Sequence, residues 1–385
     1  MVWSSQHRNL RGAEMIPQTI NDPVAQALAD FQGYVFSHPV AKDTFTNLGA
    51  ALGASSSPQI IIFTGPTGVG KSTLARAARN RLLLYYEERM SLEPDFVPVV
   101  TINAVPPNGT GFSWKDFHIR LLHGQGEPLV NRKLILPRQG SLLPDHGFET
   151  NGLEQSTADA LRRAVEEYLR LRKTKLLVID EAQHLLLVGG KQRLECQFEC
   201  LKSLTIETGV TILLIGTYRL LDILEQSGQL TRRSQMVNYP RYDMRSSEDR
   251  KNFRKILGFF EQRLSKYVQA RLDSHAEYFY QKSAGCVGIL KDWLARCLEY
   301  ALREEASLID AVFAERFALK NRGLMTIIEE ACLGEAKLAD VGDDRLLDLL
   351  KNGVLLARDE PGAIKRPRRP GTRNPKRDPV GVVLS

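Results

Sequence analysis

The segment Gly65-Pro-Thr-Gly-Val-Gly-Lys-Ser72 has the residue types and the spacing of a loop that binds phosphate groups. Its glycines let backbone N–H groups curl around phosphates, the Lys71 ammonium can reach the β- and γ-phosphates, and the Ser72 hydroxyl can ligate Mg²⁺. A strand-like apolar run at 59–64 precedes it and a helical pattern begins at Lys71, which is the setting that a P-loop requires. We therefore predict that ATP and Mg²⁺ bind here, with these contacting residues: Gly65, Pro66, Thr67, Gly68, Val69, Gly70, Lys71, Ser72 and Thr73.

A pair of carboxylates follows a second apolar run, in Lys175-Leu-Leu-Val-Ile-Asp-Glu-Ala-Gln-His184. Four consecutive apolar residues are typical of a strand that is covered on both faces of a parallel sheet, and such sheets carry their chemistry at the carboxyl ends of the strands. We predict that Asp180 helps to bind the nucleotide and hold Mg²⁺, and that Glu181 orients and deprotonates the attacking water. With the P-loop, this pair predicts hydrolysis of ATP as well as binding.

Length and composition indicate a cytoplasmic protein of two or three domains. The chain has 385 residues, of which 43% are hydrophobic, and this is enough to bury a large core. No apolar run reaches the eighteen or so residues of a membrane span, and the N-terminus lacks the apolar core of a secretory signal. The sequence therefore predicts no membrane partner. The five cysteines lack the clustered spacing of a zinc site.

Positive charge is concentrated near the C-terminus. The formal net charge is +7, and seven lysines and arginines lie within residues 365–377 with no acid among them, so the rest of the chain is formally neutral. Prolines interrupt the same stretch, which excludes a helix or a central strand and predicts a disordered tail. Such a tail can hold phosphates or an acidic partner, or it can serve only to keep the chain soluble.

Strand and helix patterns alternate along the first two thirds of the chain, which predicts a wound α/β sheet. Further strands are expected at 97–103 and 210–216, with helices at 71–88, 114–122, 155–171 and 192–207. Only helical patterns follow residue 247, at 248–264, 275–282, 287–305 and 308–318. The predicted domains are an N-terminal appendage (1–50), an α/β nucleotide-binding core (51–246) with an insertion near 123–152, a helical lid (247–320), a short helical segment (321–357) and a basic tail (358–385).

This order of elements resembles the AAA+ ATPases. The resemblance implies an AAA+ P-loop core with a parallel sheet, followed by a helical lid. It also implies that Thr217, at the end of its strand, hydrogen-bonds near the γ-phosphate. Lys291 lies in Gly285-Cys-Val-Gly-Ile-Leu-Lys291, where the lid's own sensor would be and where an arginine is common in the superfamily.

A neighbouring subunit is expected to complete the active site. Negative charge builds on the γ-phosphate oxygens in the transition state, and an arginine supplied in trans can raise the rate by roughly three to five powers of ten. Gly228-Gln-Leu-Thr-Arg-Arg-Ser234 resembles the segment that carries such a residue in AAA+ proteins. We predict that Arg233 is the arginine finger, with Arg232 as the next candidate.

A series of shorter motifs resembles the TnsC/TniB family of AAA+ regulators of DNA transposition. The motifs are Asp180-Glu-Ala-Gln-His184, Cys200-Leu-Lys-Ser-Leu204, Ile215-Gly-Thr-Tyr218, Gln229-Leu-Thr-Arg-Arg-Ser234 and Tyr239-Pro-Arg-Tyr242. The resemblance implies assembly with ATP on duplex DNA as a ring or helical filament, a signal from a target-selecting protein, and recruitment of the transposase. Hydrolysis would then disassemble the oligomer.

The same resemblance points to the loop after the second strand as the DNA contact, through Thr110, Lys115 and Arg120. A few phosphate contacts per subunit, repeated around a ring, give salt-dependent binding without sequence readout. In the alternative reading, Lys115 and Arg120 solvate a helix face while Trp114 packs into the core. Two other functions remain open, namely a replication initiator or helicase loader and a signalling or secretion switch ATPase with a protein partner.

Overall fold

The computed structural model describes most of the predicted core and lid, in residues 22–53, 59–106, 111–124, 156–186, 191–224, 234–339 and 342–352. Several predicted features fall outside these ranges: Thr110, Arg232, Arg233, the insertion from residue 125 onward and the basic tail. The chain divides into two compact units, Met1–Leu338 and Ala339–Ser385. In the second unit, the helix α17 (Asp343–Asn352) is described.

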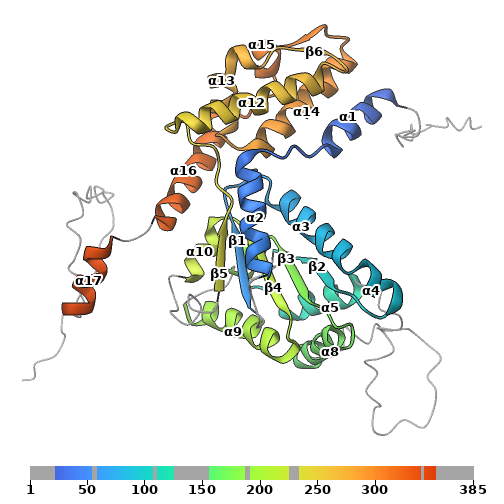
Figure 1. The fold of residues 1–385 in the computed structure, drawn as a ribbon, viewed down its shortest axis with the longest axis vertical. Coiled ribbons are helices and arrows are strands. Elements are labelled where there is room, and N and C mark those ends of the chain that lie inside the picture. The colour runs from blue at the N-terminus through green and yellow to red at the C-terminus, as the bar shows by residue number, and fades with distance from the viewer. Residues whose placement is uncertain are drawn as a thin grey trace, which may run out of the picture. The chain divides into compact units, whose positions relative to one another are not determined.

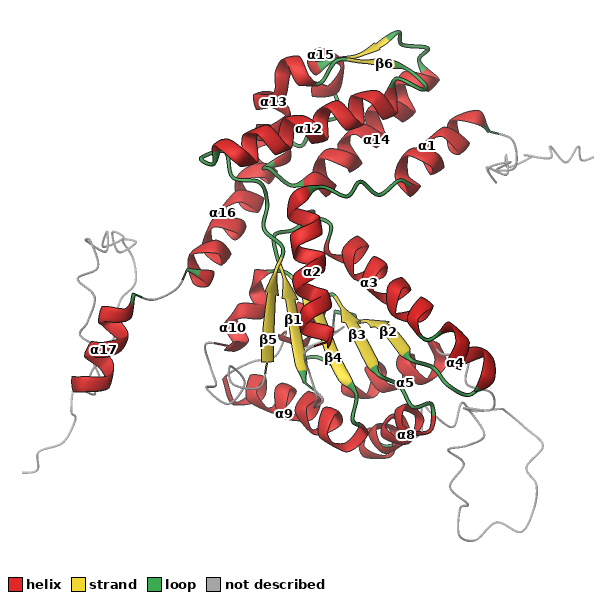
Figure 2. Ribbon diagram, in the orientation of Figure 1, coloured by secondary structure: helices red, strands yellow, loops and turns green. Residues whose placement is uncertain are grey.

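Five parallel strands form the central sheet, in the order β2-β3-β4-β1-β5 (Figure 2). Their bounds are β1 (Ile60–Thr64), β2 (Val99–Asn103), β3 (Leu176–Asp180), β4 (Thr211–Gly216) and β5 (Ser234–Asn238). Because all five run the same way, their carboxyl ends meet at one edge, where Thr64 lies opposite Gly216 and Asn103 opposite Asp180. This edge carries the P-loop and the acidic pair.

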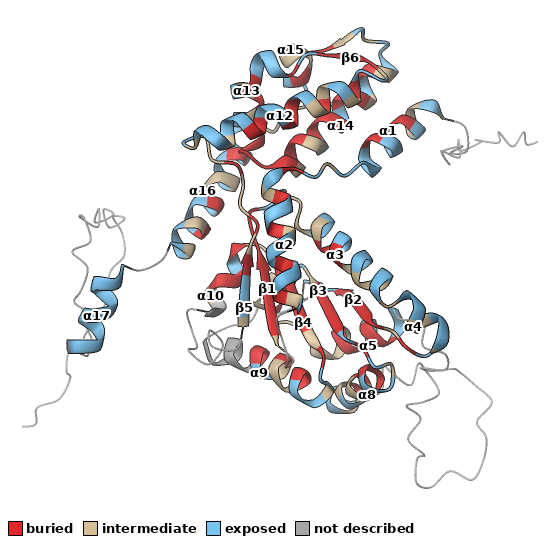
Figure 3. Cartoon of the chain, in the orientation of Figure 1, coloured by how far each residue is buried: buried red, intermediate tan, exposed pale blue. Residues whose placement is uncertain are grey.

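Side chains that alternate along the strands enter two separate cores, so most of the strand residues are buried (Figure 3). Ile60 and Ile62 of β1 face one core, and Ile61 and Phe63 face the other. Helices cover both faces of the sheet (Figure 1). On one face lie α2 (Pro39–Gly53) and α3 (Lys71–Tyr85), and on the other lie α5 (Trp114–Gly124), α8 (Ala158–Leu171) and α9 (Lys191–Thr208). This burial on both faces accounts for the continuous apolar runs in the sequence.

A third core lies in the lid, by which we mean the elements from α12 to α15. The bounds are α12 (Ser247–Leu264), β6 (Gln269–Ala270), α13 (Ala276–Ser283), α14 (Val287–Arg303), β7 (Leu308–Ile309) and α15 (Ala311–Glu315). Trp293 and Leu294 of α14 are almost fully buried in this core. The prediction that strands end before residue 247 is wrong, because β6 and β7 pair in parallel. The predicted helix at 308–318 accordingly starts as a strand.

Other differences from the predicted elements are small. The helix expected at 71–88 ends at Tyr85, and α4 (Glu87–Leu92) follows it. The strand β5 was not predicted from the sequence, and its pairing with β1 is seen only in the fold. The short helices η1 (Ala182–Leu186), η2 (Tyr218–Leu220) and α10 (Leu221–Leu224) follow β3 and β4. Across the described ranges, no helix is long and apolar enough to cross a membrane.

The N-terminal region contributes to both the core and the lid. The helix α1 (Pro23–Gly33) packs against α14 and places Phe31 in the lid core. The next helix, α2, packs against α3, β1 and β5 and places Leu48 in the core beside the sheet. Residues between them therefore cross from the lid to the nucleotide-binding core, a role that the sequence did not reveal.

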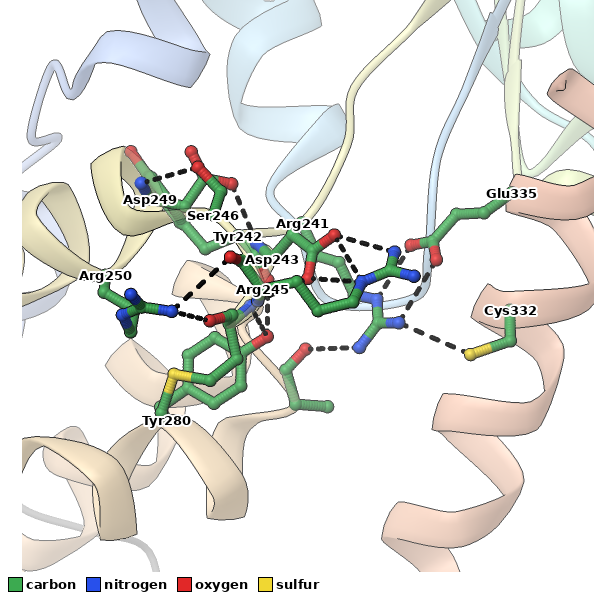
Figure 4. A network of polar contacts seen from close by, with 12 residues as sticks. Arg241, Tyr242, Asp243, Arg245, Ser246, Asp249, Arg250, Tyr280, Cys332 and Glu335 are labelled. Carbon is green, nitrogen blue, oxygen red and sulfur yellow. Dashed lines mark hydrogen bonds and ion pairs between the residues drawn. The ribbon is translucent and has the colours of Figure 1, made fainter.

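The helix α16 (Asn321–Leu338) is joined to the segment that follows β5 by an ion pair (Figure 4). The Arg241 guanidinium donates to both Glu335 oxygens, at 2.8 and 3.1 Å, and its NH2 group also contacts the Cys332 sulfur at 3.4 Å. This hydrogen bonding raises the pKa of Arg241 above its ordinary value. The same helix packs against η2, where Gly334 lies directly on the Tyr218 ring. One helix thus contacts the segments that leave β4 and β5.

Candidate nucleotide-hydrolysis site

Three glycines give the P-loop its path between β1 and α3. Gly68 and Gly70 have positive φ angles of 75° and 112°, in the region that side chains disfavour. At Gly65, an added Cβ would lie 2.4 Å from the Tyr239 carbonyl oxygen, so no side chain fits. The backbone N–H groups that turn around a phosphate therefore depend on glycine at these three positions.

Lys71 begins α3 and is held at the mouth of this loop. Its ammonium donates to the carbonyl oxygens of Gly65, at 2.9 Å, and Pro66, at 2.8 Å. Burial lowers the pKa of Lys71 to about 8, a shift that the charges of Cys286, Glu181 and Asp180 oppose. A half-buried ammonium that donates only to neutral carbonyls in the described residues is stabilised by an anion, so the site fits the phosphates of ATP.

The acidic pair lies where β3 ends, two strands away from the P-loop strand. The Asp180 carboxylate accepts from the Glu181 backbone N–H at 2.8 Å, and Glu181 has a φ of 54°. That left-handed conformation is unusual for a residue other than glycine, and such strain is found at functional sites. The turn therefore holds Glu181 at the carboxyl edge of the sheet, on the same side as Lys71.

Thr217 follows β4, the strand between β1 and β3, and occupies the N-cap position of η2. Its backbone N–H donates to the Gln183 side-chain oxygen at 3.3 Å. The structure thus brings together the predicted residues Lys71, Asp180, Glu181 and Thr217 at one edge. Gln183, which the sequence analysis did not single out, connects two of them.

Mg²⁺ fits this site as part of the bound nucleotide. Within the described ranges, no group of three or more His, Cys, Asp or Glu side chains could hold a metal ion. Mg²⁺ is commonly held by one or two protein oxygens together with substrate phosphates, and Ser72 and Asp180 supply such oxygens. When bound, the ion would neutralise charge that develops on the phosphates.

The lid meets the P-loop through main-chain atoms. The backbone N–H of Ile289, in the first turn of α14, donates to the Gly68 carbonyl oxygen at 3.1 Å. A Cβ on Gly288 would lie 2.3 Å from that oxygen. Lys291, the predicted lid sensor, instead donates to the carbonyl oxygens of Gln32, at 2.6 Å, and Tyr34, at 2.8 Å. It would have to leave both contacts to reach a nucleotide.

A buried histidine links the N-terminal region to the P-loop. The His38 Nδ1 atom lies 2.8 Å from the Tyr242 hydroxyl, and Nε2 lies 3.2 Å from the Tyr239 hydroxyl. The backbone N–H of Ala41 also donates to Nδ1, which places the imidazole proton on Nε2. Tyr239 in turn lies against Gly70. Burial lowers the pKa of His38 to about 4, so the ring is neutral near pH 7.

Acid is expected to destabilise the chain through His38. Below pH 6.5 the unfolded chain binds a proton at this residue, whereas the folded chain does so only near pH 4. The free energy of unfolding should therefore be largest above pH 6.5 and fall by up to about 3 kcal/mol towards pH 4. Urea unfolding at several pH values should show a smaller decline in His38→Gln, which is less stable at neutral pH. The other titrating groups are the same in the wild type and in His38→Gln. An equal fall in the free energy of unfolding in both proteins would therefore show that His38 is not responsible for the acid sensitivity.

The predicted DNA-contact residues that the structure describes lie on α5. Arg120 is exposed and forms an ion pair with Asp116, at 2.7 Å. Lys115 is half-buried in the first turn. Trp114 packs against the core beside Phe117, and its Nε1–H donates to the Gln197 side chain. The alternative expectation for Trp114, that it packs, is therefore confirmed.

Comparison with known proteins agrees with this site. Residues 54–224 match the family model described as an AAA domain. The chain therefore has the P-loop fold of an AAA+ domain, with a five-stranded parallel sheet and a helical C-terminal region, and is an ATPase. AAA+ ATPases in general bind ATP with Mg²⁺. Of the motifs that resemble the TnsC/TniB family, those at 180–184, 200–204 and 215–218 lie within the matched residues, and those at 229–234 and 239–242 lie beyond them.

Similarity to solved structures is low, and no curated protein matches the chain by sequence. The ORC2 protein of Aeropyrum pernix has 14% identity and a TM-score of 0.46, over 83% of this chain and 73% of that chain. Cdc6p of Pyrobaculum aerophilum has 14% identity and a TM-score of 0.46, over 74% and 67%. Domain III of the Thermotoga maritima replication initiation protein DnaA has 14% identity and a TM-score of 0.39, over 78% and 95%.

Proposed function

We propose that this ATPase regulates DNA transposition. In its ATP-bound form it assembles on duplex DNA without sequence preference, receives a signal from a target-selecting protein and recruits the transposase. Hydrolysis of ATP then disassembles the oligomer. Lys71 binds the phosphates, Ser72 and Asp180 hold Mg²⁺, Glu181 activates water, Thr217 senses the γ-phosphate, and Arg233 of one subunit completes the site of the next.

One observation carries this proposal: two of the family-like motifs are joined at the active-site edge. Gln183 of Asp180-Glu-Ala-Gln-His184 accepts from Thr217 of Ile215-Gly-Thr-Tyr218. A third motif packs beneath them, because Leu201 and Leu204 of α9 share a core with Leu185 and Leu220. Motifs that are scattered over the sequence therefore belong to one physical unit around the hydrolysis site. This arrangement supports a common role for these motifs in hydrolysis.

Duplex DNA should stimulate the ATPase activity and support assembly. The direct test measures ATP hydrolysis with and without random-sequence duplex DNA, and images the protein with a slowly hydrolysed ATP analogue by electron microscopy. DNA-dependent stimulation with rings or filaments supports the proposal. If duplex DNA neither changes the rate nor supports assembly, the proposed DNA function is wrong and a protein partner becomes the better candidate.

Lys115→Ala with Arg120→Ala should separate DNA binding from the contribution of the basic tail. If both side chains contact phosphates, the double variant should bind DNA more weakly and lower the salt slope by up to about two units per subunit. Deletion of residues 361–385 should instead leave assembly on DNA largely intact but abolish transposition. Affinities measured over a range of salt concentrations, with a transposition assay, check both outcomes.

Arg303→Ala provides a matched control for the change at Arg120. Arg303 is also an exposed arginine that pairs with an acid on its own helix, Glu299 at 3.2 Å, but it lies in the lid. Its removal should leave the salt slope unchanged. If the tail deletion alone eliminates DNA binding and the α5 double variant has no effect, the tail is itself the DNA-binding element.

A further inference from the structure

Gln183 connects the residue proposed to activate water with the turn proposed to sense the γ-phosphate. Its side-chain Nε2–H donates to the Glu181 Oε2 atom. Its Oε1 atom accepts from the backbone N–H of Thr217, at 3.3 Å. Gln183 lies in η1, directly after β3, and Thr217 directly follows β4. The amide therefore spans the two neighbouring strands.

The space for this amide is built into the fold. An added Cβ on Gly216 would lie 2.5 Å from the Gln183 Oε1 atom and 2.8 Å from the Leu220 side chain, so a larger residue would displace the amide from this position. On the other side, the positive φ of Glu181 and its N–H bond to Asp180 fix the start of the Glu181 side chain. Gln183 thus reaches Glu181 from a position that its neighbours determine.

The hydrogen bond between Gln183 and Glu181 can assist hydrolysis by restraining the Glu181 carboxylate. A glutamate that takes a proton from water must direct one carboxylate oxygen at that water, and an exposed glutamate side chain can adopt many rotamers. Donation to Oε2 restrains the carboxylate and leaves Oε1 for the water. An amide is well suited to this link because it donates with one atom and accepts with the other.

We propose that Gln183 is a positioning residue for ATP hydrolysis, which fixes the direction of the Glu181 carboxylate relative to Thr217. It acts through Glu181, to which it donates. Movement of Thr217 on contact with the γ-phosphate is then transmitted to the carboxylate through one side chain. This inference rests on the proposed role of Glu181.

Two substitutions test the link. Gln183→Met has a similar length and makes neither hydrogen bond, whereas Gln183→Glu still accepts from Thr217 and places a second carboxylate beside Glu181. Misplacement of a catalytic group by about 1 Å costs on the order of a hundredfold in rate. We expect kcat to fall about tenfold to a hundredfold in Gln183→Met and further in Gln183→Glu, with KM for ATP and the Tm unchanged.

A second readout does not depend on turnover. Binding of ADP with aluminium fluoride and Mg²⁺, which resembles the transferred phosphoryl group and its water, should raise the Tm of the wild type more than ADP does. Gln183→Met should lose most of this additional shift and keep the shift from ADP. Gln59→Met is the matched control, because Gln59 donates to the Ala51 carbonyl oxygen before the start of β1, at the opposite end of the sheet.

Glu181→Gln, assayed in parallel, keeps the two hypotheses distinguishable. If Glu181→Gln hydrolyses ATP normally, the proposed catalytic site is wrong. If Glu181→Gln is inactive but Gln183→Met has normal kcat and a normal aluminium fluoride shift, only the positioning role is overturned. An increase of kcat in Gln183→Met would also overturn it, since the contact would then restrain Glu181 away from the water.

Discussion

Lys71→Ala is expected to abolish nucleotide binding, whereas Glu181→Gln is expected to bind ATP and lose hydrolysis. The Lys71 ammonium is half-buried at the P-loop, and removing one partner of a hydrogen-bonded charge pair costs about 2 to 5 kcal/mol, which is a loss of affinity of roughly thirtyfold to several thousandfold. An amide at position 181 keeps the shape of the side chain but cannot accept a proton, so kcat should fall by about 10² to 10⁴. Binding of a fluorescent ATP analogue and steady-state hydrolysis measure the two effects separately.

Lys42→Ala controls for removal of a positive charge, because Lys42 is exposed on α2. It should retain both binding and hydrolysis. Glu181→Gln should in addition remain assembled on DNA, since the proposed oligomer disassembles only on hydrolysis. Near-normal turnover by Glu181→Gln would remove this residue from the catalytic role.

Mixtures of Arg233→Ala with Glu181→Gln are expected to recover activity that neither variant has alone. The proposed site takes its glutamate from one subunit and its arginine from the next, so about a quarter of interfaces in an equal, random mixture combine an intact residue of each kind. Each variant alone should lose several powers of ten in rate. Hydrolysis measured over a series of mixing ratios should therefore pass through a maximum.

A mixture of Lys71→Ala with Glu181→Gln is the control for this experiment. Both changes disable the subunit that binds the nucleotide, so no arrangement of neighbours restores a complete site. If Arg233→Ala and Glu181→Gln co-assemble and stay inactive at every ratio, the finger lies elsewhere, with Arg232 the next candidate.

The sequence was most informative where one local motif fixes both the backbone and the chemistry. Glycine at 68 and 70 and a lysine at 71 can be read as a phosphate loop because the turn needs positive φ angles. Asp180 and Glu181 could be placed at a strand end because an apolar run precedes them. Gln183 was overlooked because its significance depends on Thr217, which is distant in sequence and adjacent only once β3 and β4 pair.

The elements that the sequence missed are those that depend on pairing with distant residues. In β5, only Val237 is buried, so the strand lacks the apolar run that revealed the others. The strands β6 and β7 have two residues each, which is too short for any periodicity. Lys291 was predicted as the lid sensor from its position in a family-like motif, whereas the lid approaches the P-loop through Gly288 and Ile289, where the contact is made by main-chain atoms.

The approach of α14 to the P-loop has a consequence for how this protein can diverge. Gly68 and Gly288 face each other with no room for a Cβ, so the spacing between lid and loop is set by the radii of main-chain atoms. Substitutions elsewhere on the lid can alter its surface without changing that spacing. A saturation library should therefore tolerate many residues at exposed lid positions such as Val312 but almost none at Gly288. The exposed surface of the lid can therefore change while the geometry of the P-loop stays the same.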